Sequence, residues 1–378
     1  MSIYPTFLMP KLKIYLLTTL LTIGLSVPGF AQDFESAKYG GDFLSVGGGA
    51  RALGMGGAQT AFVNDITSGY WNPAGLARME DLELAYMHSQ RFAGIVNYDY
   101  GALGLPVRNS EGVIGISFFR QGIDGIKNTM EAWDFENNRP RSNPADYFTE
   151  FSAADMALFL TYAAAATDNL NWGVSAKVIN HRLGPFADAW GYSLDVGMQY
   201  QTSDYYFGVN LMDITTMMKF WSVDSEELAP LGDEDMFGGE FGSEMPEGQN
   251  ERVLPTVKLG LGRIFDFNDF QLTTALDADF RFEGRQTYFY NVGDISIEPH
   301  VGVELGYHDL IFLRTGVTDF HLDEEGNHYV SPTIGAGLKV GSVFLDYGFS
   351  SFAGIASDLG FTHRISLNVS LDPDVFSR

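Results

Sequence analysis

The chain has 378 residues, a formal net charge of −25 and no cysteine. The acidic excess argues against nucleic acid as a partner, because phosphate recognition needs a basic surface. The lack of cysteine excludes disulfides, thiolate metal ligands and thiol catalysis. Glycine is abundant at 43 residues, and aromatic residues make up 14% of the chain. This composition suits a membrane β-barrel, in which lipid-facing apolar side chains alternate with small or polar ones that face the lumen.

The first 31 residues have the pattern of a signal peptide. Lys11 and Lys13 precede an apolar run over 14–27, and small residues close the segment at Ala31. The run is shorter than the roughly 20 residues that a membrane-spanning helix needs. We therefore expect residues 1–31 to be a signal peptide that is cleaved after Ala31, and the protein to be exported to the bacterial outer membrane.

Residues 32–81 differ in composition from the rest of the chain. The stretch 45–58 is rich in glycine, which permits tight backbone paths. Asn72 is suited to cap a short helix that begins at Pro73, because asparagine accepts the free amide hydrogens there and proline has none to satisfy. Nucleotide-binding loops are also glycine-rich, but no Lys-Ser/Thr pair or βαβ unit accompanies this stretch. We predict that residues 32–81 form a compact N-terminal hatch, or plug, inside a barrel.

Alternation of apolar and polar residues predicts the fold of the remainder. From Trp190 to Tyr200 the even positions are apolar or aromatic and the odd ones are small or polar, and 362–371 repeats the pattern. The predicted strands are 82–90, 93–105, 113–121, 153–166, 170–183, 189–201, 205–213, 254–265, 270–281, 298–307, 310–318, 328–340, 343–350 and 362–371. A soluble sandwich would alternate too, but fourteen is an even number, as in single-chain outer-membrane barrels. The fold class is therefore all-β, a transmembrane antiparallel up-and-down β-barrel over 82–371 with a C-terminal tail at 372–378.

The connections between these strands alternate in length. Short ones lie at 167–169, 202–204, 266–269, 308–309 and 341–342, and long ones at 122–152, 214–253, 282–297, 319–327 and 351–361. Bacterial barrels sort their connections in this way, with short periplasmic turns and long external loops. The external loop at 214–253 is acidic, with ten carboxylates between Asp224 and Glu251. It lacks the regular ligand spacing of a calcium loop, so neither a metal site nor a cofactor is predicted.

Charged residues fall on the polar faces of the predicted strands. In lipid at mid-depth each would cost several kcal/mol, so we expect these side chains to face the lumen. The lumen-facing charges are Asp195, Lys258, Asp277, Asp279, Glu304 and Arg364. A fourteen-stranded barrel is wider than the eight-stranded barrels that side chains fill and narrower than open porins. Something must therefore occupy the bore, and the N-terminal hatch is the candidate.

The N-terminal segment resembles a known family. The string from Gly49 to Ala58, followed by Asn64-Asp65 and then by Tyr70 to Leu76, is similar to the N-terminal signature of the PorV/PorQ family. That family is itself similar to the FadL-type long-chain fatty-acid transporters, with fourteen strands and a hatch that bears an Asn-Pro-Ala motif. The residues that the resemblance assigns to the hatch are Arg51, Gly54, Gly56, Gly57, Asn72, Pro73 and Ala74.

The resemblance implies two different functions. PorV-like members serve type IX protein secretion, so we expect first a non-enzymatic accessory barrel that binds translocon proteins and cargo at the cell surface. The alternative is a FadL-like transporter of fatty acids or other hydrophobic small molecules. Outer-membrane lipids are expected partners in both cases. An enzyme is not expected, because the 7 histidines lie in no recognisable nucleophile motif and Gly-x-Ser-x-Gly is absent.

Overall fold

The computed structural model describes most of the chain between residues 34 and 372. The described residues are 34–37, 40–107, 112–134, 137, 139–224, 227, 248, 250–284, 290–322, 328–351 and 360–372, without the side chains of 34–36, 321, 322 and 328. The predicted signal peptide at 1–31 and nearly all of the predicted tail at 372–378 lie outside them. Among the described residues, no helix is both long and apolar enough to cross a membrane.

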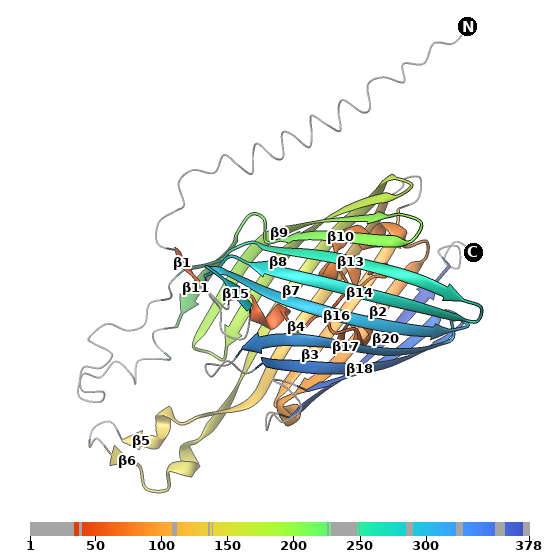
Figure 1. Ribbon diagram of the computed structural model, residues 1–378. Helices are drawn as coiled ribbons and strands as arrows, with labels where there is room; N and C mark the ends of the chain where they lie inside the picture. Colours follow the sequence, from red (N-terminus) through yellow and green to blue (C-terminus); the bar gives the residue numbers. More distant parts are fainter. Residues whose placement is uncertain are drawn as a thin grey trace.

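Fourteen antiparallel strands form a closed barrel (Figure 1). They are β2 (Leu82–Arg91), β3 (Val96–Pro106), β4 (Gly112–Asn128), β7 (Thr149–Thr167), β8 (Leu170–Leu183), β9 (Ala187–Gln201), β10 (Tyr205–Met212), β13 (Thr256–Phe267), β14 (Phe270–Arg281), β16 (Ile295–Tyr307), β17 (Ile311–Leu322), β18 (His328–Val340), β19 (Val343–Ser351) and β20 (Phe361–Leu371). Each pairs with the next of the fourteen, and β2 pairs with β20, so that the sheet closes on itself. Closure gives the backbone groups partners where lipid offers none. The predicted fold class is confirmed.

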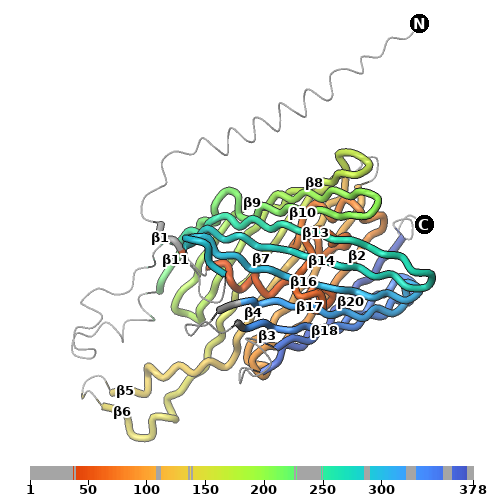
Figure 2. Tube along the Cα trace, in the orientation of Figure 1, coloured from red at the N-terminus to blue at the C-terminus, as the bar shows by residue number. Residues whose placement is uncertain are grey.

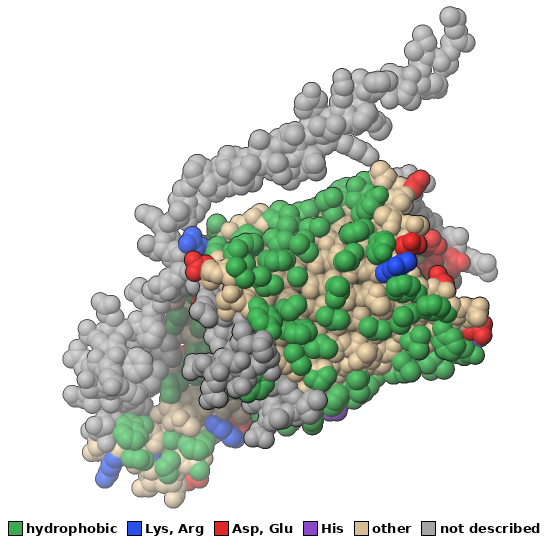
Figure 3. Space-filling model, in the orientation of Figure 1, with side chains coloured by type: hydrophobic (Ala, Val, Ile, Leu, Met, Phe, Trp, Pro, Cys, Tyr) green, Lys and Arg blue, Asp and Glu red, His purple; other side chains and the backbone are tan. Residues whose placement is uncertain are grey.

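Side-chain alternation places apolar residues on the outside of this barrel. In β9, Trp190, Tyr192, Met198 and Tyr200 are exposed, whereas Asp195 is buried. Figure 3 shows apolar side chains spread over the visible barrel wall and charged ones gathered toward its ends. A soluble monomer rarely exposes so continuous an apolar surface, whereas a membrane barrel needs one against the lipid. The molecule is therefore a transmembrane barrel of the outer-membrane type.

The two ends of the barrel differ, as predicted from the loop lengths. Tight turns at 168–169, 202–204, 268–269, 308–310 and 341–342 lie at one end, which we call the turn rim. The longest connections lie at the other end, the loop rim, together with two short ones at 92–95 and 184–186. Tyr200, Tyr205 and Phe270 are exposed beside the tight turns. Aromatic side chains favour the membrane interface, so this row marks the interface at the turn rim.

The predicted loop at 122–152 is wrong at both of its ends. Strand β4 continues to Asn128 and β7 already begins at Thr149, so their hairpin projects beyond the wall (Figure 1). The projection carries a small sheet of β5 (Trp133–Asp134) and β6 (Arg139–Pro140). The register shifts between Ile123 and Ile126, which breaks the alternation that the prediction relied on.

The predicted acidic loop at 214–253 is also partly strand. Its two ends are β11 (Met217–Val223) and β12 (Asn250–Val253), which pair with each other, and β11 also pairs with the loop-rim half of β9. Residues 225–226, 228–247 and 249, which hold most of its carboxylates, lie outside the described residues. In the connection 282–297, the short strand β15 (Tyr290–Val292) pairs with β16.

The segment that precedes the barrel strands runs through the lumen (Figure 2). We call residues 40–81 the N-terminal segment. Its elements are η1 (Asp42–Leu44), α2 (Ala50–Gly54), α3 (Ser68–Trp71) and η2 (Pro73–Arg78). Just before it, β1 (Phe34–Ser36) pairs in parallel with β12 at the loop rim, and just after it β2 starts at the turn rim. The chain therefore crosses the barrel from one rim to the other before it builds the wall.

Glycine lets the backbone of the N-terminal segment come into direct contact with the backbone of the barrel wall. Gly56 has a φ of +62°, and a Cβ atom there would lie 2.7 Å from the Val301 carbonyl oxygen and 2.8 Å from the Val317 nitrogen. A Cβ on Gly54 would lie 3.0 Å from the Cα of Gly335 in β18. Any larger residue would push the segment away from β16, β17 and β18, so part of the high glycine content serves this contact.

We predict that Gly56→Ala loosens the N-terminal segment. The new methyl group adds a steric overlap of about 1–3 kcal/mol to the roughly 1–2 kcal/mol of strain that a positive φ imposes on alanine. Limited proteolysis of the detergent-solubilised barrel should cleave within 40–81 faster than in the wild type. The matched control is Gly293→Ala, which has a φ of +64° but nothing within 4 Å of the new atom. Equal cleavage rates in the two variants would contradict the prediction.

Candidate functional site

Two cavities lie on opposite sides of the N-terminal segment. The loop-side cavity has a volume of about 140 Å³ and is bounded by residues near the loop-rim ends of β2, β14, β16, β17, β19 and β20. The turn-side cavity, of about 490 Å³, is bounded by the turn-rim ends of β2, β14, β17, β19 and β20. Helix α2 belongs to both, since Ala52 and Leu53 line the first and Arg51 lines the second. The segment thus divides the lumen into two compartments.

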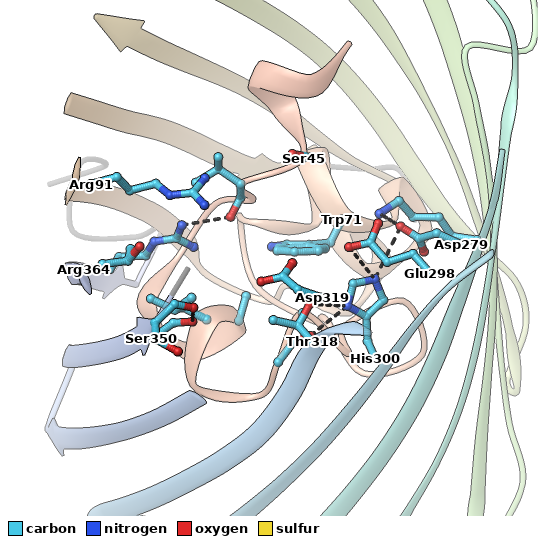
Figure 4. Close-up of a pocket in the computed structure, with 18 of the residues that line it drawn as sticks. Ser45, Trp71, Arg91, Asp279, Glu298, His300, Thr318, Asp319, Ser350 and Arg364 are labelled. Atoms are coloured by element: carbon cyan, nitrogen blue, oxygen red, sulfur yellow. Dashed lines mark hydrogen bonds and ion pairs between the residues drawn. The ribbon is translucent and has the colours of Figure 1, made fainter. Parts of the chain in front are cut away.

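The loop-side cavity has an aromatic ring at its centre and charged groups on either side (Figure 4). The ring is that of Trp71, whose Nε1 donates to the carbonyl of Gly48 at 2.7 Å. On one side lies Arg364, which is 1% exposed and donates from Nη2 to the carbonyl of Val46 at 2.8 Å. Both contacts hold the N-terminal segment by its own backbone. The cavity therefore combines one flat apolar surface with polar walls.

On the other side of the ring, a histidine faces two carboxylates. Asp279 pairs with Lys258 at 2.5 Å, and Glu298 pairs with Arg281 at 3.5 Å. His300 Nε2 lies 3.7 Å from an oxygen of Asp279 and 3.9 Å from an oxygen of Glu298. The three residues come from β14 and β16, which are neighbours in the wall. Alternation turns all three toward the lumen.

The wall of the turn-side cavity holds a charge network that reaches the N-terminal segment. Arg51 donates from Nε and Nη2 to the two oxygens of Glu304, both at 3.0 Å. Glu304 also accepts from Arg314 Nε at 2.5 Å, and Arg314 in turn pairs with Asp346. Burial alone would lower the pKa of Arg51, but the facing Glu304 carboxylate outweighs it and holds that pKa above its ordinary value. The network links α2 to β16, β17 and β19.

Two more of the predicted lumen charges bind inside the barrel. Asp195 lies 3.3 Å from the fully buried Lys177, which is also 2.8 Å from Asp213. Asp213 has a φ of +54° at the break between β10 and β11, so its side chain turns inward where the strand is interrupted. Asp277 accepts from the backbone nitrogen of Thr60 at 2.7 Å. Both carboxylates therefore have stabilising partners, and neither faces an open pore.

The predicted hatch residues fall into two groups on different parts of the wall. Arg51, Gly54, Gly56 and Gly57 belong to α2 and the turn after it, which contact β16, β17, β18 and β19. Asn72, Pro73 and Ala74 start η2, which lies against β7, β8 and β9. The structure therefore does not bring the two groups together in one site.

The expected cap is present at the start of η2. Asn72 Oδ1 accepts from the backbone nitrogen of Ala74 at 3.2 Å, and its Nδ2 donates to the carbonyl of Thr60 at 2.8 Å. The side chain is fully buried, so all of its hydrogen-bonding capacity has to be met inside the lumen. Asn72 thereby joins two turns of the N-terminal segment to each other.

Some residues of the cavities received no role from the sequence. The motif string contains Trp71 but gives it no role, and alternation predicts a strand end at Asp213 rather than an inward turn. His300 follows Glu298 by two positions, so both lie on the same face of β16. That spacing was a usable signal, and reading it together with Asp279 on the neighbouring strand would have found the cluster.

Comparison with known proteins supports the fold alone. No family model and no curated protein matches the sequence. The CymD monoaromatic hydrocarbon channel is similar in structure, with 14% sequence identity, a TM-score of 0.50 and coverage of 86% of this chain and 98% of that one. The toluene transporter TodX of P. putida has 13% sequence identity and a TM-score of 0.49, and the match covers 86% of this chain and 99% of that one. A FadL homologue of Pseudomonas aeruginosa has 14% identity and a TM-score of 0.48, with coverage of 85% of this chain and 98% of that one. These neighbours are of FadL type, and they do not confirm the PorV/PorQ resemblance.

We predict that Arg51→Met destabilises the barrel by roughly 2–3 kcal/mol, because it removes two charge-assisted hydrogen bonds from a largely buried carboxylate. The matched control is Lys339→Met, which breaks a pair with Asp309 whose side chains are 44% and 69% exposed. An exposed pair of this kind contributes about 0–1 kcal/mol. Urea unfolding of the detergent-solubilised protein, followed by tryptophan fluorescence, measures both. If the two variants unfold at the same urea concentration, the network does not contribute to the stability of the barrel as predicted.

Proposed function

We propose that the protein is an outer-membrane channel for small hydrophobic molecules that carry a polar group. The observation that carries the proposal is a barrel lumen divided by the N-terminal segment, with a cavity on each side of the division. A channel of this form holds its solute at an intermediate point, whereas an open porin does not. The segment would then act as the hatch between the two compartments.

The chemistry of the loop-side cavity supports this solute class. A cavity of roughly 150 Å³ holds a benzene-sized ring, and the loop-side cavity has about 140 Å³. Trp71 offers a ring face for stacking, and Val46 and Leu53 add apolar surface. Hydroxyl and charged groups around them would bind a polar substituent of the solute. The proposed solute is therefore a single ring or a short apolar chain with a polar group.

This proposal reverses the order of the two functions that the sequence suggested. A secretion accessory was expected first and a FadL-like transporter second. CymD is described as a monoaromatic hydrocarbon channel and TodX as a toluene transporter, and the fold shared with CymD is compatible with such a channel. The transporter is therefore the better supported of the two, and its lipid-facing wall would place it in the outer membrane.

We predict that the protein raises the uptake of single-ring compounds and that Trp71→Ala removes most of this increase. The substitution takes away the only phenylalanine, tyrosine or tryptophan side chain that lines the loop-side cavity among the described residues. The measurement is the initial uptake of radiolabelled phenol and p-cresol by a Gram-negative host that lacks channels of this type, with and without the protein. Sucrose serves as the polar solute that should not be affected.

The matched control is Trp190→Ala, since Trp190 is 47% exposed on the lipid-facing side of β9. Uptake through this variant should equal that of the wild type when both are present in the membrane in equal amounts. If the host with the wild-type protein takes up both ring compounds no faster than the host alone, the proposed function is wrong.

A further inference from the structure

Three side chains at the loop-side cavity have the composition of a metal site. Asp279, Glu298 and His300 each offer one donor atom, and these atoms all lie within 4.8 Å of one another. Asp279 and His300 are buried, and Glu298 is half-buried beside the cavity. Imidazole nitrogen and carboxylate oxygen together are ligands of divalent cations such as Zn²⁺.

The distances suit a shared cation better than direct hydrogen bonds. His300 Nε2 is 3.7 Å from Asp279 Oδ2 and 3.9 Å from Glu298 Oε1. A direct N–H···O bond is roughly 2.7–3.2 Å long, and His181 reaches Asp155 at 2.8 Å elsewhere in this barrel. Ligands at about 2.0–2.2 Å from one tetrahedral ion lie roughly 3.3–3.6 Å apart. The separations of 3.7 and 3.9 Å between His300 and the two carboxylates therefore need to shorten by only a few tenths of an ångström for the three groups to share an ion.

The other nitrogen of His300 fixes the direction of the ring. Nδ1 lies 2.8 Å from the carbonyl of Gly56 and 3.2 Å from the hydroxyl of Thr318. A carbonyl can only accept, so Nδ1 carries the proton and a neutral ring has its lone pair on Nε2. A lone pair that faces two carboxylates needs a proton or a metal cation beside it, and the separations of 3.7 and 3.9 Å are longer than N–H···O hydrogen bonds. Histidines that bind metals usually donate their second nitrogen to a backbone carbonyl in this way.

Of the two neighbouring cations, Arg281 leaves a ligand oxygen available for a metal, whereas Lys258 competes with the metal for one. Arg281 lies 3.5 Å from Glu298 Oε2, whereas Oε1 is the oxygen that faces His300. Lys258 is the direct competitor, because its Nζ lies 2.5 Å from the Asp279 oxygen that faces His300. The Lys258 ammonium also lies 5.5 Å from the centre of the Trp71 ring, which offers it a cation–π contact when it leaves the carboxylate.

We propose that Asp279, Glu298 and His300 bind one divalent cation of the zinc type, with its open coordination position toward the loop-side cavity. The bound cation would keep Nδ1 of His300 protonated and hence keep its hydrogen bond to Gly56. The site thereby joins the N-terminal segment to β14 and β16. The proposal does not depend on which solute the barrel carries.

The test is isothermal titration of Zn²⁺ into the full-length protein in detergent, after removal of metal with a chelator. The wild type should bind one Zn²⁺. His300→Gln should weaken Zn²⁺ binding by at least about 10–100-fold. Even the loss of a residue that only hydrogen-bonds to a metal ligand typically weakens metal binding by that factor. Lys258→Met should instead tighten binding, because it removes the competing ammonium. If the three residues form only salt bridges and bind no metal, Lys258→Met should not tighten the binding of Zn²⁺.

The matched control is His181→Gln, which removes a buried histidine that also pairs with a carboxylate but lies in β8. It should bind Zn²⁺ like the wild type. If His300→Gln fails to fold, Glu298→Gln takes its place, since it leaves the bond between His300 and Gly56 intact. The proposal is overturned if the wild type binds no zinc. It is also overturned if the His300 or Glu298 variant binds zinc as tightly as the wild type, or if the His181 variant loses binding.

Discussion

A strand inside a lipid bilayer cannot leave its amides and carbonyls without partners, and the rest of this molecule depends on that constraint. Pairing the last strand with the first satisfies it by closing the sheet. A ring of fourteen strands, however, encloses more space than inward side chains alone would fill. The N-terminal segment occupies that space, and glycines on the wall admit its backbone. At Gly260, for example, a Cβ atom would lie 2.7 Å from the backbone nitrogen of Ala61.

An apolar cluster that includes Ile66, Leu76 and Phe119 packs inside this barrel. Charged side chains of the wall also hold the N-terminal segment, and they act on its backbone as much as on other side chains. Asp277 receives two backbone N–H groups of the N-terminal segment, and Arg364 donates to two of its carbonyls. Such contacts do not need long side chains on the segment, which is why a glycine-rich stretch is held in one place. A buried charge without a partner would cost several kcal/mol, so each contact also disfavours other positions of the segment.

The positions of the strands could be predicted from the sequence because alternation and turn length are local properties. The last strand was predicted at 362–371 and lies at 361–371. Prediction failed where a single residue breaks the local pattern, as at the bulge beside Gly125 and at the inward turn of Asp213. For the site, alternation could assign a charge to the lumen but could not name its partner. Arg51 and Glu304, which pair at 3.0 Å, are separated by most of the barrel in sequence.

The path of the N-terminal segment also bears on how the molecule is assembled. Strand β1 is attached to β12 at the loop rim, while the chain leaves the lumen at the turn rim to begin β2. The early part of the polypeptide thus passes lengthwise through a ring that its own later part completes. If the barrel closed first, the N-terminal part of the chain would have to thread through the lumen from one rim to the other. Strands that wrap around the segment during insertion avoid this passage, so the simplest order of biogenesis makes the seam between β2 and β20 the last to form.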